Sequence, residues 1–162
     1  MANQCEQLLR LLQKEGVQAE LVRTNAPYSP AWSGRVPVLR ALFRLLPYFA
    51  ALWRSAGRAE VMHVFANSGW SWYLFASPAL WVGRARGVPV IVNYRGGQAD
   101  EFFSSSRGPV LRQLAGAALR VTPSVFLQRV FDRHGLAVRI IPNIIDLDRF
   151  QPSARLLDPA AP

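Results

Sequence analysis

The sequence is poor in cysteine and has no long apolar run, and each scarcity excludes a class of protein. Cys5 is the only cysteine, which excludes an internal disulfide and any metal site built from several cysteines. The longest apolar stretches, residues 45–53 and 70–82, fall short of the about 20 residues that a spanning helix needs. Gln4, Glu6 and Gln7 interrupt the first positions, which does not fit a secretory signal. We therefore expect a cytoplasmic protein.

Acidic residues are also scarce, and lysine is nearly absent. Ten acidic residues stand against 19 basic ones, all arginine except Lys14, so the net charge is +9. Such a balance suits an anionic partner: a phospholipid surface, a phosphorylated substrate or nucleic acid. Compositional bias of the genome explains a preference for arginine equally well. Aromatic and basic residues are not interleaved on any predicted strand, so we expect no nucleic-acid partner.

The most informative stretch present is VPVIVNYRGG, residues 88–97, a β-branched apolar run that ends at Arg95, Gly96 and Gly97. A strand buried on both faces of a parallel sheet has this pattern. Ligands of open α/β sheets bind just past the carboxyl ends of such strands. Glycine lets the backbone approach a ligand, and arginine offers a planar fork to phosphate or carboxylate. The run therefore predicts both a fold and a site.

Helical and strand periods alternate along the chain. Helices are predicted at residues 3–15, 36–54, 71–86, 108–117 and 124–134, and strands at residues 18–24, 60–66, from 88, 119–122 and 138–141. This order predicts a single α/β domain with a doubly wound, mostly parallel sheet. Such domains normally begin with a central strand and a glycine turn, whereas this chain opens in a helix. We therefore expect that a first strand is missing upstream, or that the start is an internal methionine.

Four motifs in order carry a resemblance to a known family. They are EVMHVFANSGWSW (60–72), RGVPVIVNYRGG (86–97), RVTPSVFLQRVFDRHG (120–135) and RIIPNIIDLDRFQP (139–152). Together they resemble the amino-terminal half of a family 4 glycosyltransferase, an enzyme with two facing Rossmann-like domains. The resemblance implies a Rossmann-like acceptor-side domain over residues 1–150, incomplete at its start, and a linker or tail at 151–162 towards a donor domain.

The same resemblance implies an activity. The complete enzyme would transfer a sugar from a nucleotide-sugar donor to an acceptor with retention, without a metal or other cofactor. In the family, the donor domain carries a Glu-x7-Glu motif and most contacts to the nucleotide-sugar, and this chain lacks that domain. We therefore expect the chain alone to be inactive. A noncatalytic binding or membrane-docking module, or one half of a split enzyme, remains the alternative.

Two positions depart from the family pattern. The family commonly has a histidine where this chain has Arg95, and arginine stays protonated, so its role here would be electrostatic and not that of a base. Ile144 replaces the glycine of the family's "IPNGVD" phrase, which disfavours a tight left-handed turn after Asn143.

The candidate site residues follow the predicted strands at their carboxyl ends. They are Asn67, Ser68, Arg95, Gly96 and Gly97 for an acceptor or donor phosphate and, through the resemblance, Asn143 at the interdomain crevice. Each has a simpler interpretation. Arg95 could form a salt bridge with Asp100 or Glu101 that only shapes the loop. Helix capping would account for Asn67 or Ser68, and turn chemistry for Asn143.

Three other polar residues are weaker candidates. His63 lies inside an alternating strand, so a core histidine bonded to a backbone carbonyl is favoured over a catalytic one. Asp100 and Glu101 are adjacent and do not share a face of any regular element, which is typical of loop charges. We predict no metal site.

Residues 36–58 form a long amphipathic segment. At ~100° per residue, Arg40, Arg44, Arg54 and Arg58 fall within an arc of about 80°, opposite Val38, Leu42, Leu45, Phe49, Leu52 and Trp53. One interpretation is a helix at an anionic membrane interface, on the inner face of the membrane. The other, favoured here, is a helix that covers the sheet while its arginines are solvated. Pro47 is expected to kink it in either case.

Overall fold

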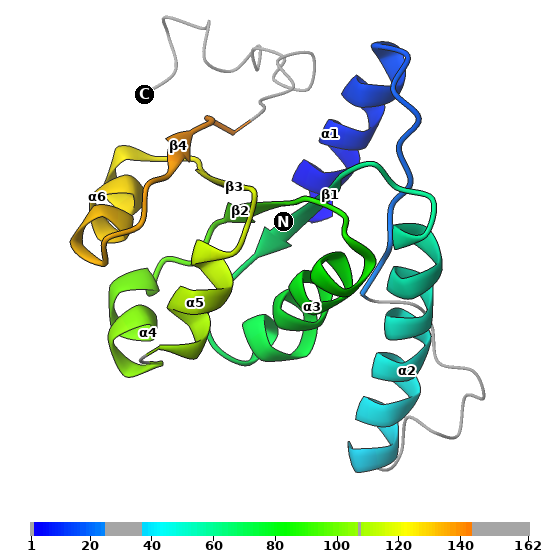
Figure 1. The fold of residues 1–162 in the computed structure, drawn as a ribbon, viewed down its shortest axis with the longest axis horizontal. Coiled ribbons are helices and arrows are strands. Elements are labelled where there is room, and N and C mark those ends of the chain that lie inside the picture. The colour runs from blue at the N-terminus through cyan, green and yellow to red at the C-terminus, as the bar shows by residue number, and fades with distance from the viewer. Residues whose placement is uncertain (1, 25–36, 107, 144–162) are drawn as a thin grey trace, which may run out of the picture.

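The computed structural model describes residues 2–24, 37–106 and 108–143. They form an α/β domain with an all-parallel sheet and flanking helices (Figure 1). The strands are β1 Met62–Ala66, β2 Val90–Tyr94, β3 Leu119–Thr122 and β4 Arg139–Ile140. The helices are α1 Ala2–Lys14, α2 Pro37–Ala56, the π-helix η2 Trp72–Ala76, α3 Ser77–Arg86, α4 Ala99–Ser105, α5 Pro109–Ala115 and α6 Val125–Arg133. The predicted Rossmann-like α/β fold class is confirmed.

The strand order in the sheet is β1-β2-β3-β4, the order of the chain. Each crossover therefore moves one strand further in the same direction, and right-handed crossovers then leave their helices on one face of the sheet. Leu80 of α3, Phe103 of α4, Leu114 of α5 and Phe131 of α6 belong to one buried cluster with the side chains of β2, in agreement with this arrangement. The carboxyl ends of all the strands lie at the same edge.

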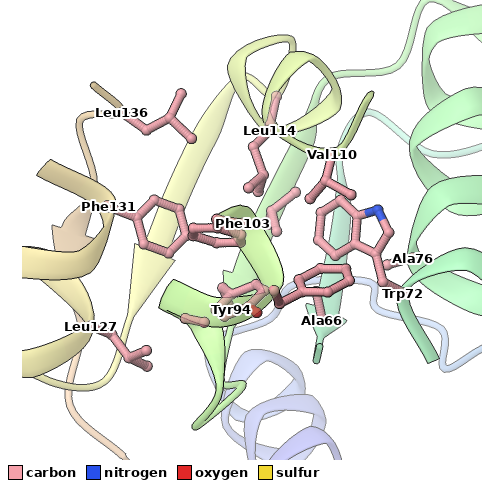
Figure 2. Close-up of a cluster of buried hydrophobic side chains, with 14 of the residues drawn as sticks. Ala66, Trp72, Ala76, Tyr94, Phe103, Val110, Leu114, Leu127, Phe131 and Leu136 are labelled. Atoms are coloured by element: carbon pink, nitrogen blue, oxygen red, sulfur yellow. The ribbon is translucent and has the colours of Figure 1, made fainter. Parts of the chain in front are cut away.

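The main core is aromatic and lies between the sheet and these helices. Figure 2 shows Tyr94 at its centre, with Trp72, Phe103 and Phe131 around it. The ring centroids of Tyr94 and Phe103 are 5.1 Å apart, as are those of Phe103 and Phe131. Burying one phenyl group stabilises a fold by about 1.5–3 kcal/mol. The cluster therefore fixes where β2 ends, and with it the position of the loop that follows.

Local sequence signals mark the ends of two helices as expected, Gly87 the end of α3 and Ser124 the start of α6. Gly87 adopts a left-handed conformation, φ 68°, at the end of α3, which a residue with a side chain rarely adopts. The Ser124 side chain accepts a hydrogen bond from the Leu127 amide and caps α6. The short helix α4 is not among the predicted elements, because the two glycines before it indicated a loop.

A second, smaller core joins α2 to α3. Tyr48, Leu52 and Ala56 make an i, i+4, i+8 stripe that packs against Ala79 and Val82. The Tyr48 hydroxyl donates a hydrogen bond to the Phe75 carbonyl at 2.9 Å. The stripe shows that α2 covers the domain along one side. No helix among the described parts of the chain is long and apolar enough to cross a membrane.

The predicted apolar face of α2 is only partly correct. Leu52 is buried, but Phe49 and Trp53 are exposed, because the stripe through Tyr48 already fills the contact with α3. Arg58 lies beyond the end of the helix at Ala56, and α2 continues through Pro47. The predicted positions of the Arg40 and Arg44 side chains lie outside the described residues.

The strand predicted at residues 18–24 is wrong. This segment has no strand structure and is held by side chains instead. Val22 packs against the second core, and Glu20 accepts hydrogen bonds from Ser55 at 3.2 Å and from Arg58 at 3.3 Å. Alternation of apolar and polar residues favours an extended chain, but in the described part of the structure no backbone pairs with this segment.

Candidate functional site

The candidate site lies where β1 and β2 end. Ala66 is the register partner of Tyr94, and the Arg95 amide donates a hydrogen bond to the Ala66 carbonyl at 2.9 Å. Parallel pairing thus continues one residue past β2, and the loops that follow the two strands leave the sheet side by side. The structure therefore brings Asn67 and Ser68 together with Gly96, as the sequence predicted from the shared edge.

The two loops meet at Gly96, which is buried. A Cβ atom at this position would overlap the Ser68 hydroxyl and lie 2.8 Å from both the Ser68 amide nitrogen and the Tyr94 hydroxyl. The Ser68 and Tyr94 hydroxyls are themselves hydrogen-bonded at 2.7 Å. Burial raises the pKa of Tyr94 to about 12, so this phenol stays neutral. Glycine is needed here because the neighbouring loop approaches closely.

Gly97 and Asn67 have simpler environments. Gly97 is exposed, with open space where a Cβ would lie. The Asn67 side-chain oxygen accepts a hydrogen bond from the amide of Ser68 at 3.0 Å, which shapes the turn after β1. This bond is made within the loop and does not cap a helix, so the capping interpretation of Asn67 does not describe the contact found.

Arg95 is half-buried and held on three sides. Its Nε donates to the Asn93 side-chain oxygen at 3.1 Å, and its Nη1 donates to the Asn143 side-chain oxygen at 2.6 Å. Its guanidinium carbon lies 4.9 Å from the centroid of the Phe65 ring. Burial lowers the pKa of Arg95, yet arginine remains protonated at neutral pH. The site therefore contains a fixed positive charge.

The salt bridge considered for Arg95 is not formed. Asp100 instead accepts hydrogen bonds from Arg133 at 2.8 Å and pairs with His134 at 3.0 Å. These two partners lower the pKa of Asp100, His134 having the larger effect. Within the described ranges no carboxylate lies within ion-pairing distance of Arg95. Its charge is thus held by neutral amides and an aromatic face, and not by an acid.

Asn93 connects Arg95 to His63 and was missed by the sequence analysis. Its side-chain nitrogen lies 3.2 Å from His63 Nε2, and the residue is 4% exposed. Successive side chains of a strand point to opposite faces, so Asn93 lies on the face away from Tyr94. An amide inside an apolar strand was the available signal, because a buried polar group is costly unless it is hydrogen-bonded.

His63 corrects a second prediction. It is exposed, and its partner is the Asn93 side chain and not a backbone carbonyl, because β1 lies at the edge of the sheet. Its ring stacks on Phe65 at 4.9 Å. Desolvation lowers the pKa of His63, and the positive charge of Arg95 adds to the effect. Because Asn93 Oδ1 accepts from Arg95, Asn93 Nδ2 donates to a neutral His63.

Helix α1 adds one thiol near this network. Burial raises the pKa of Cys5, although the chain's amino terminus and Arg95 act in the opposite direction. The thiol is therefore mainly protonated at neutral pH. In the described part of the chain, no cluster of three or more His, Cys, Asp or Glu residues could hold a metal ion. What the arrangement offers chemically is a positioned cation beside a glycine loop, suited to an anionic oxygen.

Comparison with known proteins identifies the family. The family model described as Glycosyltransferase Family 4 matches residues 1–149, which is nearly the whole chain. The search of the curated proteins found no match. The family match, the parallel sheet and the loops at its carboxyl edge agree with one another. This chain belongs to glycosyltransferase family 4.

Proposed function

We propose that this chain is the acceptor-side domain of a glycosyltransferase that transfers a sugar from a nucleotide-sugar donor with retention. The observation that carries the proposal is the guanidinium of Arg95, held by Asn93 and Asn143 at the edge of the sheet where ligands bind. Residues 1–150 form this domain, and residues 151–162 lead towards a donor domain.

The role of Arg95 is electrostatic. A sugar nucleotide releases a phosphate as its leaving group, and a positioned cation stabilises the charge that develops there. Asn93 and Asn143 keep the guanidinium in place before substrate arrives, so little reorganisation is needed during the reaction. Gly97 is exposed and leaves the loop backbone accessible, while Gly96 packs against the neighbouring loop of Asn67 and Ser68, which forms the other wall.

Asn143 links the site to the interdomain crevice. It follows β4 and Pro142, yet its side chain contacts Arg95 directly. Turn chemistry alone does not account for that bond. We therefore assign Asn143 to the wall of the crevice that faces the donor domain.

The proposal also covers the activity of the chain alone and its surroundings in the cell. The chain alone is inactive, because the nucleotide-sugar contacts belong to a donor domain that these residues do not contain. A noncatalytic or split-enzyme role is the second candidate, and adding a separate donor domain to the chain would distinguish the two. The high positive charge supports a cytoplasmic enzyme that contacts an anionic membrane surface.

The test uses a complete enzyme in which this domain is joined to a donor domain. Arg95→Ala should lower kcat/KM by ~100-fold, on the scale of losing one preorganised contact to developing charge. Arg95→Lys should recover part of the loss, because it keeps the charge but not the fork. Arg112→Ala, at an exposed arginine on α5, is the matched control and should leave kcat/KM unchanged.

Two results would contradict the proposal. Near-normal kcat/KM for Arg95→Ala would mean that the guanidinium only supports the loop. Sugar transfer by the present chain, with no donor domain added, would overturn the assignment of the donor contacts to another domain.

A further inference from the structure

Three aromatic side chains stack on the outer surface of α2 and α3, and neither core uses them. Phe49, Trp53 and Trp81 are 38%, 36% and 55% exposed. The Trp53 and Trp81 rings lie 6.0 Å apart at 29°, and Phe49 lies 6.4 Å from Trp53 and 5.6 Å from Trp81. We call these three residues the aromatic patch. Such an exposed apolar cluster usually marks an interaction surface.

The patch belongs to two helices that Figure 1 shows side by side. Phe49 and Trp53 are one turn apart on α2, on a different side from the Tyr48 stripe that packs on α3. Leu46, one turn before Phe49, is 60% exposed and extends the apolar surface. The rings line a shallow hollow of about 430 Å³ together with Ala50 and Arg54. The packing of α2 therefore does not explain why these residues are apolar.

The polar groups at the patch are all positive. The guanidinium of Arg86 lies 4.3 Å from the Trp53 ring centroid and donates to the Trp53 carbonyl at 3.1 Å. Arg54 lines the hollow and donates to the Ala50 carbonyl at 3.2 Å. Helices α2, η2 and α3 contain no aspartate or glutamate. The rings therefore complement an apolar layer, and the arginines, with no acid on these helices, complement an anionic layer that covers it.

We propose that the aromatic patch, with Arg54 and Arg86, docks this domain on an anionic phospholipid bilayer. Tryptophan favours the bilayer interface, where its ring is apolar and its N–H remains hydrated. A second copy fits less well, because a symmetric contact would bring the same arginines together from both chains. The proposal rests on the membrane contact proposed above and assigns it to these rings together with Arg54 and Arg86. Arg54 is the member of the predicted arginine arc that it retains.

The test measures binding of the full chain to vesicles. Vesicles of phosphatidylglycerol and phosphatidylcholine provide the anionic surface, and pure phosphatidylcholine is the control surface. The unchanged chain should sediment with the anionic vesicles only. Trp53→Ala/Trp81→Ala should weaken this binding by at least ~10-fold through lost apolar contact. Trp70→Ala, at a tryptophan that is 79% exposed in the helical turn before η2, is the matched control and should bind normally.

A second pair of measurements separates insertion from simple charge attraction. With Trp32 and Trp70 replaced by phenylalanine, the remaining tryptophans are Trp53, Trp81 and the fully buried Trp72. Brominated lipid should quench the emission of Trp53 and Trp81, which only rings near the acyl chains allow, and leave the emission of Trp72 as an unquenched background. Arg54→Gln/Arg86→Gln alters surface groups alone and should weaken binding by about 30-fold. This variant keeps the test decisive if the tryptophan variant fails to fold, which circular dichroism would show.

The outcomes are distinguishable. If the unchanged chain binds no vesicles, both this inference and the proposed membrane contact are wrong, while the glycosyltransferase assignment is unaffected. If it binds and neither pair of substitutions at the patch weakens binding, the membrane contact stands and the patch is the wrong surface. If the tryptophan variant instead converts a dimer to a monomer in sedimentation equilibrium, the occupant is a second copy and the lipid proposal fails.

Discussion

Tyr94 and Asn93 are neighbours in β2, yet they face opposite sides of the sheet and serve different ends. Tyr94 points into an aromatic core to which η2, α3, α4, α5 and α6 contribute. Asn93 points to the other face, where it holds Arg95 and contacts His63. On the first face the contacts are apolar and numerous, and on the second they are few, polar and specific. Alternation along one strand thus separates the apolar core from the polar candidate site.

The largest effect on stability should come from the apolar face. Phe103→Ala removes a fully buried ring that contacts Tyr94, Phe102 and Phe131, and should lower the free energy of unfolding by about 3–5 kcal/mol. Chemical denaturation measures it. Trp70→Ala, which removes an exposed ring, should change stability by no more than about 0.5 kcal/mol. A loss below 1 kcal/mol for Phe103→Ala would mean that the core does not depend on this cluster.

A smaller effect on stability is expected at Gly96, where the loops after β1 and β2 touch. Gly96→Ala places a methyl group against Ser68 and the Tyr94 hydroxyl, and should cost about 1–3 kcal/mol of unfolding free energy as the loops separate. Gly97→Ala has open space and should be nearly neutral in the same denaturation experiment. Equal stabilities for the two variants would show that the close approach of the loops is not a constraint.

The smallest effect belongs to the polar face and depends on pH. The pKa of His63 is lowered in the folded chain, so below about 6.5, the ordinary value, the unfolded chain binds a proton that the folded chain resists. Stability should therefore decline as pH falls from 6.5 towards the folded pKa. His63→Gln should flatten this part of the profile. The lowered pKa of Asp100 acts in a separate, more acidic range, below about 4.

A resonance titration of the His63 imidazole should find it titrating below its ordinary value of about 6.5. If His63 titrates at or above its ordinary value, the neutral imidazole and its bond from Asn93 are incorrectly assigned.

Much of the fold was predictable because continuous or alternating apolar runs report burial directly. The run at residues 88–94 gave β2, and Ser124 and Gly87 marked helix boundaries through their own chemistry. The segment at 18–24 was mispredicted because alternation specifies an extended chain but not a partner strand. An alternating pattern indicates the backbone conformation of a segment, but whether the segment becomes a strand depends on a neighbouring strand with which it can form hydrogen bonds.

The candidate site was predictable in outline but not in its contacts. Arg95 and Gly96 were identified from their place after a buried strand, and the shared edge brought in Ser68. Asn93 was overlooked because one amide does not alter an apolar pattern, although its two hydrogen bonds organise the site. The exposure of Trp53 was missed for a related reason: a helical projection sorts residues by side, but only the neighbouring helix decides which part of an apolar side it covers.

The contact between Gly96 and Ser68 has a consequence for how relatives of this chain can diverge. Because the space at position 96 is filled by the residue at position 68, the two positions cannot change independently. A relative with a larger residue at position 96 must have a different turn at position 68 and a smaller group in place of the Tyr94 hydroxyl, because the Ser68 amide and that hydroxyl also border the space. We therefore expect the two loops to vary together during evolution as one inherited unit, although positions 68 and 96 are 28 apart in the sequence.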